Sequence, residues 1–196
     1  MLARSAVLTL GLCAYLTALD LPNPVDIRVP LVNQKAEEWC WLAVAQMAIQ
    51  FRTGHAPDQC EMLSLENPRE RKACCAAPFR CERKGTMEDI QAVLLEYGKV
   101  KSDLVPPVNF GELYNAIRQG DPVIIAYESA PNKFHVVVAR GMKFLGDEER
   151  ITPLVLVNDP MAAQPLWVPY KRIRETWTAT LIVGKPQQEL HNPRGR

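Results

Sequence analysis

The chain has 196 residues, of which 47% are hydrophobic and 7% aromatic, so it can bury one substantial core but cannot hold two large enzyme domains. Its 23 basic and 22 acidic residues give a formal net charge of +1, which argues against a disordered chain and against a strongly basic nucleic-acid-binding protein. After residue 20 there is no Gly-X-Y repeat, heptad array or long apolar span, which excludes collagens, coiled coils and membrane bundles.

Residues 1–18, MLARSAVLTLGLCAYLTA, have the order of a secretory signal peptide. One arginine precedes a run of about a dozen mostly apolar residues, and cleavage after Ala18 is compatible with the signal rules. Leu16 is larger than the residue usual three positions before a cut, which leaves an uncleaved membrane anchor as the alternative. We therefore expect a secreted or periplasmic protein with no stable membrane insertion after cleavage.

Cysteine counting predicts one free thiol. Removing the signal peptide leaves five cysteines, an odd number in an oxidising compartment: Cys40, Cys60, Cys74, Cys75 and Cys81. The last four lie in one polar segment, so we expect them to form two disulfides and Cys40 to stay free. A bond between the neighbours Cys74 and Cys75 is strained, which favours Cys60 bonded to one of them and Cys81 to the other. A four-cysteine zinc site is the alternative, but it lacks the CxxC spacing.

Three helices are predicted in the first two thirds of the chain. Apolar residues recur at helical spacing from Cys40 to about Phe51, ahead of a stop at Gly54. The second helix is predicted to open at Thr86 with a capping box and to stop at Gly98. The third, shorter helix is expected from Asn109 to Gly120 with a box at Glu112.

Short β-branched runs follow and predict the strands of one sheet or barrel. They are PVIIAY from Pro122, FHVVVAR from Phe134, PLVLV from Pro153, LWVPY from Leu166 and ATLIV from Ala179. The segment KFLGDEER is expected to be a polar connector, and residues 185–196 a flexible tail. Helices followed by strands indicate an α+β fold.

The chemistry converges on Cys40. A thiol at a helix N-terminus lies in the field of free backbone N–H groups, which favours the thiolate and its nucleophilicity. Glu37 and Glu38 oppose this effect, so activation depends mainly on a histidine partner. His135 is the candidate base because it lies inside an apolar strand, whereas His55 follows a helix stop and His191 lies in the tail.

A third residue is expected to orient the imidazole. The strand LVLV ends in Asn158, Asp159 and Pro160, so the chain delivers an amide and a carboxylate where an adjacent strand stops. Either Asp159 or Asn158 could orient the ring. Asn-Asp-Pro is also an ordinary strand terminator.

At these residues the sequence resembles the papain-like cysteine peptidases, most closely the small bacterial secreted and effector branch related to the bacteriocin-processing (C39-like) and AvrRpt2-like peptidases. The segment NQKAEEWCWLAVAQM is similar to the Gln-to-Cys-Trp block of that branch, with Gln34 six residues before Cys40. The cysteine pattern, a Gln-Cys pair, a Cys-Cys pair and a later single cysteine, also resembles that branch. The C-terminal half resembles it as well, in the segments RQGDPVIIAYES, FHVVVARG and LVLVNDP.

The resemblance implies Cys40 as nucleophile, His135 as general base and acid, Asp159 as orienting group and Gln34 as oxyanion donor. It implies a papain-like fold over residues 19–184, with a helical lobe carrying the cysteine helix and an antiparallel β lobe. Trp39 and Trp41 are then candidates to line the cleft between the lobes. Trp167 and Trp177 are expected in the core, and the basic run near the disulfides is expected to be solvated.

The sequence therefore predicts a secreted cysteine peptidase that hydrolyses peptide bonds through an acyl-enzyme. An amidase, deamidase or acyl transferase on the same fold is one alternative. A catalytically silent binding module is the other. The expected partner is a protein or peptide substrate, with no nucleic acid, no cofactor, no metal and a monomeric state.

Overall fold

The computed structural model describes residues 21–63, 68–146 and 150–186. The predicted signal peptide and most of the predicted tail lie outside these residues. Among the described helices, none is long and apolar enough to cross a membrane.

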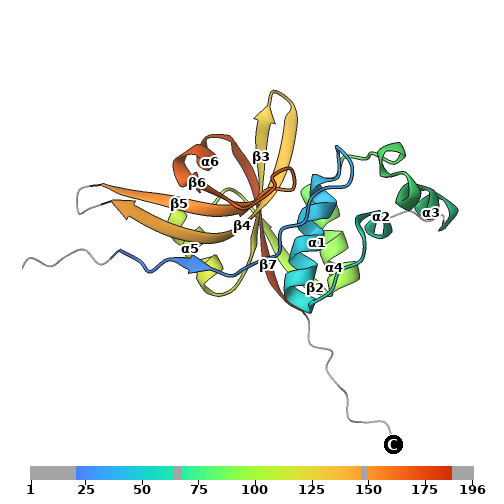
Figure 1. The fold of residues 1–196 in the computed structure, drawn as a ribbon. Helices are drawn as coiled ribbons and strands as arrows, with labels where there is room; N and C mark the ends of the chain where they lie inside the picture. The colour runs from blue at the N-terminus through green and yellow to red at the C-terminus, as the bar shows by residue number, and fades with distance from the viewer. Residues whose placement is uncertain (1–20, 64–67, 147–149, 187–196) are drawn as a thin grey trace, which may run out of the picture.

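Helices form one side of the molecule (Figure 1). They are α1 (Cys40–Thr53), α2 (Gln59–Met62), α3 (Pro68–Ala76), the 3-10 turn η1 (Pro78–Arg80) and α4 (Met87–Gly98). Eight residues of α1 are buried, and this helix packs against α4 and against the sheet. The predicted capping box at Thr86 is present, as is the left-handed Gly54 at the end of α1.

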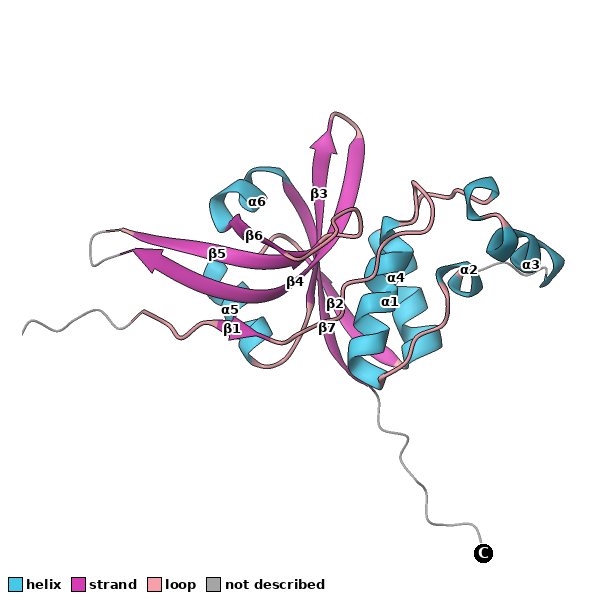
Figure 2. Ribbon diagram, in the orientation of Figure 1, coloured by secondary structure: helices cyan, strands magenta, loops and turns pink. Residues whose placement is uncertain are grey.

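An antiparallel sheet forms the other side (Figure 2). Its strands are β1 (Val25–Asp26), β2 (Val100–Val105), β3 (Val123–Ala130), β4 (Lys133–Gly146), β5 (Ile151–Asn158), β6 (Leu166–Pro169) and β7 (Trp177–Pro186). The order is β2-β7-β3-β4-β5-β6, and β1 pairs with the long strand β4. Helices α5 (Phe110–Arg118) and α6 (Tyr170–Thr176) complete the fold. The mixed architecture confirms the α+β prediction.

The strands β3 and β4 are buried on both faces, which explains their nearly continuous apolar sequences. Ile124 and Val138 lie in the core cluster that contains α1 and α4. Their neighbours Val123 and Val137 lie in a second cluster with Leu113 of α5. Because side chains alternate across a strand, the sheet separates two cores, and only the first is shared with the cysteine helix.

Several predicted boundaries are wrong. The described residues of the segment 60–81 are largely helical, β2 and α6 were missed, and residues 143–146 continue β4 instead of opening a connector. Strand β7 extends to Pro186, so the first two residues of the predicted tail, Lys185 and Pro186, belong to the sheet. Gly98 is the last residue of α4, and the left-handed residue is Lys99. Gly98 instead permits close packing, since an added Cβ would lie 3.1 Å from Ile49.

The disulfide prediction is confirmed. Cys60 is bonded to Cys75 and Cys74 to Cys81, while Cys40 is free. These four sulfurs are therefore not available to ligate zinc. Among the described residues no cluster of His, Cys, Asp or Glu could hold a metal ion. The prediction for Trp177 is correct, but Trp167 is 40% exposed, with the Lys143 ammonium over its ring.

A buried glutamine joins the helical side to the segment before Cys40. Gln59 is fully buried. Its amide donates to the Asn33 carbonyl (2.9 Å) and to the Gln46 side-chain oxygen (3.0 Å), and its own oxygen accepts from the Lys35 N–H (2.9 Å). Two of these hydrogen bonds hold the loop that carries Gln34, and the third ties Gln59 to α1.

We expect Gln59→Ala to lower the free energy of unfolding by about 2–4 kcal/mol, because it leaves buried donors and acceptors without partners. Gln50→Ala, an exposed position on α1, should change it by less than about 0.5 kcal/mol. Urea denaturation of both variants measures the difference. Equal stabilities of the two variants would contradict a structural role for the buried amide.

Candidate active site

Cys40 is the first residue of α1, and the N-terminus of this helix is not capped. The N-cap residue Trp39 makes no side-chain cap hydrogen bond, and the first turn contains no acidic residue. By contrast α2, α4 and α5 each begin with a complete capping box. The first N–H groups of a helix have no partner within it, so those of α1 remain free to act on negative charge at the Cys40 sulfur or beside it.

His135 lies near the start of β4 and is 7% exposed. It is paired across the sheet with Tyr127 of β3, whose ring meets the imidazole edge-on with 5.6 Å between centroids. One ring nitrogen, Nε2, lies 2.7 Å from Oδ1 of Asp159. The Cys40 side chain also interacts with the ring and helps to raise its pKa, and the two residues line the same hollow. The structure thus brings together three residues that the sequence selected.

Strand pairing explains why Asp159 reaches the imidazole. Strand β5 ends at Asn158, which is paired with Val138 of β4. The next residue, Asp159, therefore leaves the sheet beside the neighbouring strand that carries His135. Its Oδ1 also accepts the Met161 N–H at 2.9 Å, which holds the carboxylate in place within its own turn.

Asn158, the alternative third residue, faces elsewhere. Its side chain is fully buried and donates to the Val29 and Pro30 carbonyls at 2.9 and 3.1 Å. It ties the N-terminal segment to the end of β5. The His135 imidazole instead donates to the Asp159 carboxylate.

The electrostatics favour a protonated imidazole. Burial lowers the pKa of His135, but the hydrogen bonds and the negative charges of Asp159 and Cys40 outweigh it and raise this pKa to about 9. Burial raises the pKa of Asp159, yet its hydrogen bonds with His135 and Met161 leave it lowered overall. At neutral pH His135 is therefore an imidazolium and Asp159 a carboxylate.

Gln34 lies in the loop before α1, and its amide is turned toward that loop. Nε2 donates to the Ala36 carbonyl (3.0 Å) and the Glu37 carbonyl (2.6 Å), while Oε1 is buried without a hydrogen-bond partner. The Gln34 N–H also donates to the Pro160 carbonyl at 3.1 Å. The loop is thus anchored beside Asp159, but its amide protons are already engaged.

A hollow of about 340 Å³ surrounds the thiol and includes both Cys40 and His135. Trp41 forms part of its wall but is only 1% exposed, and Trp39 is fully buried. Their indole N–H groups donate to the carbonyls of Arg83 and Cys81 at 2.9 and 3.2 Å. The two tryptophans therefore support the cleft from beneath and present little surface to a ligand.

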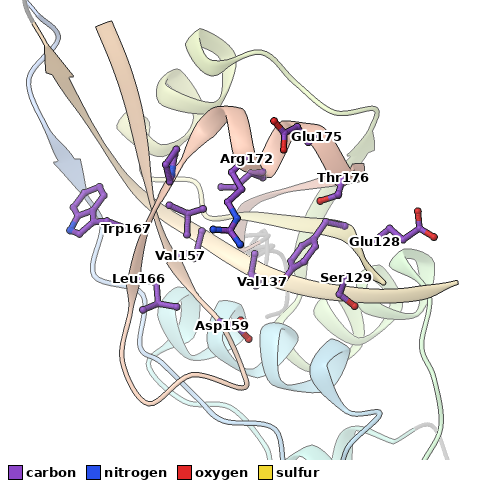
Figure 3. Close-up of a pocket in the computed structure, with 14 residues that line it drawn as sticks. Glu128, Ser129, Val137, Val157, Asp159, Leu166, Trp167, Arg172, Glu175 and Thr176 are labelled. Atoms are coloured by element: carbon purple, nitrogen blue, oxygen red, sulfur yellow. The ribbon is translucent and has the colours of Figure 1, made fainter. Parts of the chain in front are cut away.

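A larger hollow of about 640 Å³ lies between β3, β6 and α6 and includes Asp159 but neither Cys40 nor His135. Figure 3 shows Arg172 of α6 reaching across Val137 and Val157 in this space. The larger hollow is therefore not where the thiol lies. Cys40 and His135 line the smaller one.

Comparison with known proteins agrees with this geometry. The model of the Peptidase_C39-like family matches residues 26–181, a span that contains Cys40, His135 and Asp159. The chain belongs to the C39-like peptidase family. It is therefore a cysteine peptidase by family and by fold. No curated protein sequence matches this peptidase.

Solved structures share the fold of the peptidase at low sequence identity. A protein from Bacillus anthracis described as C39-like peptidase superposes with a TM-score of 0.56 at 17% identity, covering 85% of this chain and all of that chain. The peptidase domain of Streptococcus ComA, an ABC transporter involved in quorum sensing, superposes with a TM-score of 0.56 at 14% sequence identity, covering 80% of this chain and 98% of that chain. UfSP from C. elegans superposes with a TM-score of 0.52 at 13% sequence identity, covering 85% of this chain but only 35% of that chain.

Sequence reasoning missed two residues that shape the site. Tyr127 meets the His135 ring edge-on, and burial together with the neighbouring Asp159 and Cys40 raises the pKa of Tyr127 to about 12. Asn33 donates to the Pro160 and Ala162 carbonyls at 3.0 and 2.8 Å. Tyr127 could have been found from the register of the predicted hairpin. Asn33 left no signal, because its partners are 127 and 129 residues away.

We expect Asp159→Asn to lower the pKa of His135 from about 9 toward 6.5, because asparagine can still accept a hydrogen bond but carries no charge. Imidazole titration by NMR measures this, with His135→Ala to assign the resonance. The pKa of His135 is higher in the folded protein than in the unfolded chain. Protonation of His135 therefore stabilises the fold fully below about pH 6.5, and this stabilisation is lost as the pH rises through about 9. The variant should lose less stability across that window, and an unchanged titration would contradict the assignment.

Proposed function

We propose that this cysteine peptidase is exported and hydrolyses peptide bonds in other proteins through a thioester formed on Cys40. The observation that carries the proposal is the position of the His135 ring, which contacts the Asp159 carboxylate on one side and the Cys40 thiol on the other. An imidazole held in this way can take a proton from sulfur and deliver it to a leaving group.

In acylation the Cys40 sulfur forms a bond to the scissile carbonyl carbon, and the carbonyl oxygen becomes negative. The uncapped N–H groups at the start of α1 are the first donors to that oxygen. Gln34 supplies the second donor when its amide leaves one of its two loop carbonyls. The tetrahedral intermediate then expels the amine, which takes its proton from His135, and a thioester remains.

In deacylation water replaces the amine. His135, now neutral, accepts a proton from water, and the hydroxide formed attacks the thioester carbonyl. The C–S bond breaks, the carboxylic acid is released, and Cys40 and His135 return to their starting state. Asp159 keeps the ring oriented and stabilises its positive form throughout.

Export is supported by the cysteines. Two disulfides beside one free thiol are the pattern expected of an oxidising compartment, and both disulfides lie in the segment that supports the cleft wall. The free thiol is partly exposed at a helix N-terminus, as a reactive cysteine should be.

We expect brief iodoacetamide treatment without reductant to alkylate a single thiol, and peptide mapping to place it at Cys40. His135→Ala should slow this labelling, because the imidazolium that favours the thiolate is gone. The same variant should lower kcat on a casein-derived substrate by about 10²–10⁴-fold. Oxidation of Cys40 to another cysteine, or an inert native thiol, would rule out the proposal.

Gln34→Ala should lower kcat by about 10²–10³-fold with little change in KM, because an oxyanion donor acts on charge that develops only in the transition state. Steady-state kinetics measures both constants. A rise in KM with unchanged kcat would instead make Gln34 a part of the loop structure alone. Ammonia release from glutamine side chains without peptide cleavage would assign the thiol to a deamidase.

A further inference from the structure

The rim of the Cys40 hollow carries two large apolar side chains. Phe134 and Met161 both line this hollow, and they are 64% and 70% exposed. Single exposed apolar residues are common on protein surfaces and need no explanation. These two differ because they share one cleft with the reactive thiol, where a bound polypeptide would cover them.

The position of this pair relative to the scissile bond follows from His135. Phe134 directly precedes His135 in β4. Successive side chains of a strand point to opposite faces, but at this end of β4 both residues line the hollow around Cys40. The Met161 N–H donates to Oδ1 of Asp159, the same oxygen that binds the imidazole. In acylation the leaving amine takes its proton from His135, so the substrate segment on the C-terminal side of the scissile bond passes this ring. Both side chains are therefore next to the leaving segment.

The third large apolar residue of this hollow, Trp41, offers a ligand little surface. Gly85 lies so close to Trp41 that an added Cβ would be 2.2 Å from the indole ring, and Trp41 is only 1% exposed. Of the large apolar side chains that line the hollow, Phe134 and Met161 are therefore the exposed ones.

Charge does not select the substrate in this cleft. Its lining contains two acidic and two basic side chains, Glu37, Glu38, Lys84 and Lys133, so their formal charges cancel. His135 and Asp159 add a positive imidazolium and a negative carboxylate, which also cancel. A charged substrate residue gains no net attraction, whereas an apolar one gains by covering exposed apolar surface.

We propose that Phe134 and Met161 form the binding surface for an apolar side chain at the first or second residue after the cut. The substrate class is thus a polypeptide with an aliphatic or aromatic residue at one of the first two positions C-terminal to the scissile bond. The flexible methionine can adapt to side chains of different shape, so a preference for apolar character is expected, and not for one residue type. This inference rests on the proposed peptidase mechanism.

The experiment digests a proteome-derived peptide library and sequences the new N-termini. The native enzyme should produce N-termini in which Leu, Met or Phe exceed Ser or Asp by about tenfold at the first or second position. The double variant Phe134→Ser/Met161→Ser should reduce that ratio below about threefold and raise KM for an apolar test peptide with little change in kcat.

Two controls separate specificity from damage to the site. Phe79→Ser removes a phenylalanine that is 68% exposed but does not line the cleft, and it should leave the ratio unchanged. The rate of Cys40 alkylation by iodoacetamide should be the same in the double variant, because the thiol and imidazole are untouched. Both rim residues are exposed, so the substitutions should leave folding intact.

The outcomes distinguish this inference from the proposed function. Cleavage without apolar enrichment, or enrichment that survives in the double variant, would overturn the inference and leave the peptidase mechanism standing. Labelling of Cys40 with no cleavage of any library peptide would overturn the proposed function and the inference together. Loss of enrichment in the double variant alone, with normal labelling, supports both.

Discussion

The imidazole of His135 is the point on which this structure depends, because its two nitrogens need partners from two different parts of the chain. One partner, Asp159, comes from the turn after β5, and the other, Cys40, from the start of α1. A buried histidine without such partners is costly. The ring meets both partners only where the helical side and the sheet pack together, so the position of His135 relative to Cys40 depends on that packing.

Most of the surrounding polar contacts serve that meeting. Asn158 and Asn33 fix the segment before the cysteine helix to the end of β5, and Gln59 fixes the same segment to the helical side. On the far side of α1, Arg52 pairs with Asp121 at 2.5 Å and also contacts the Val183 carbonyl. Amides and one buried ion pair thus connect the two halves where apolar packing alone would allow sliding.

The N-terminus of α1 differs from those of α2, α4 and α5, because it has no capping box. Three other helices satisfy their first N–H groups with capping boxes, which contribute to stability. The cysteine helix gives up this contribution, and its free N–H groups are the ones that can stabilise negative charge. The disulfides and the buried indoles beneath the cleft compensate by holding the adjoining segment rigid.

The sequence by itself determined the fold class, the capping boxes at Thr86 and Asn109, and the free thiol, and it selected Cys40 and His135 as candidates, because each depends on local pattern, residue count or residue type. Short polar segments were harder: β2, α6 and the helices between the disulfides are set by tertiary packing that overrides a weak local signal. Only the tertiary structure decided that Asp159 and not Asn158 contacts His135, since neighbours at a strand end point in different directions. It alone placed Tyr127, Phe134 and Met161 around the site, because that requires the strand register and the course of the turn after β5.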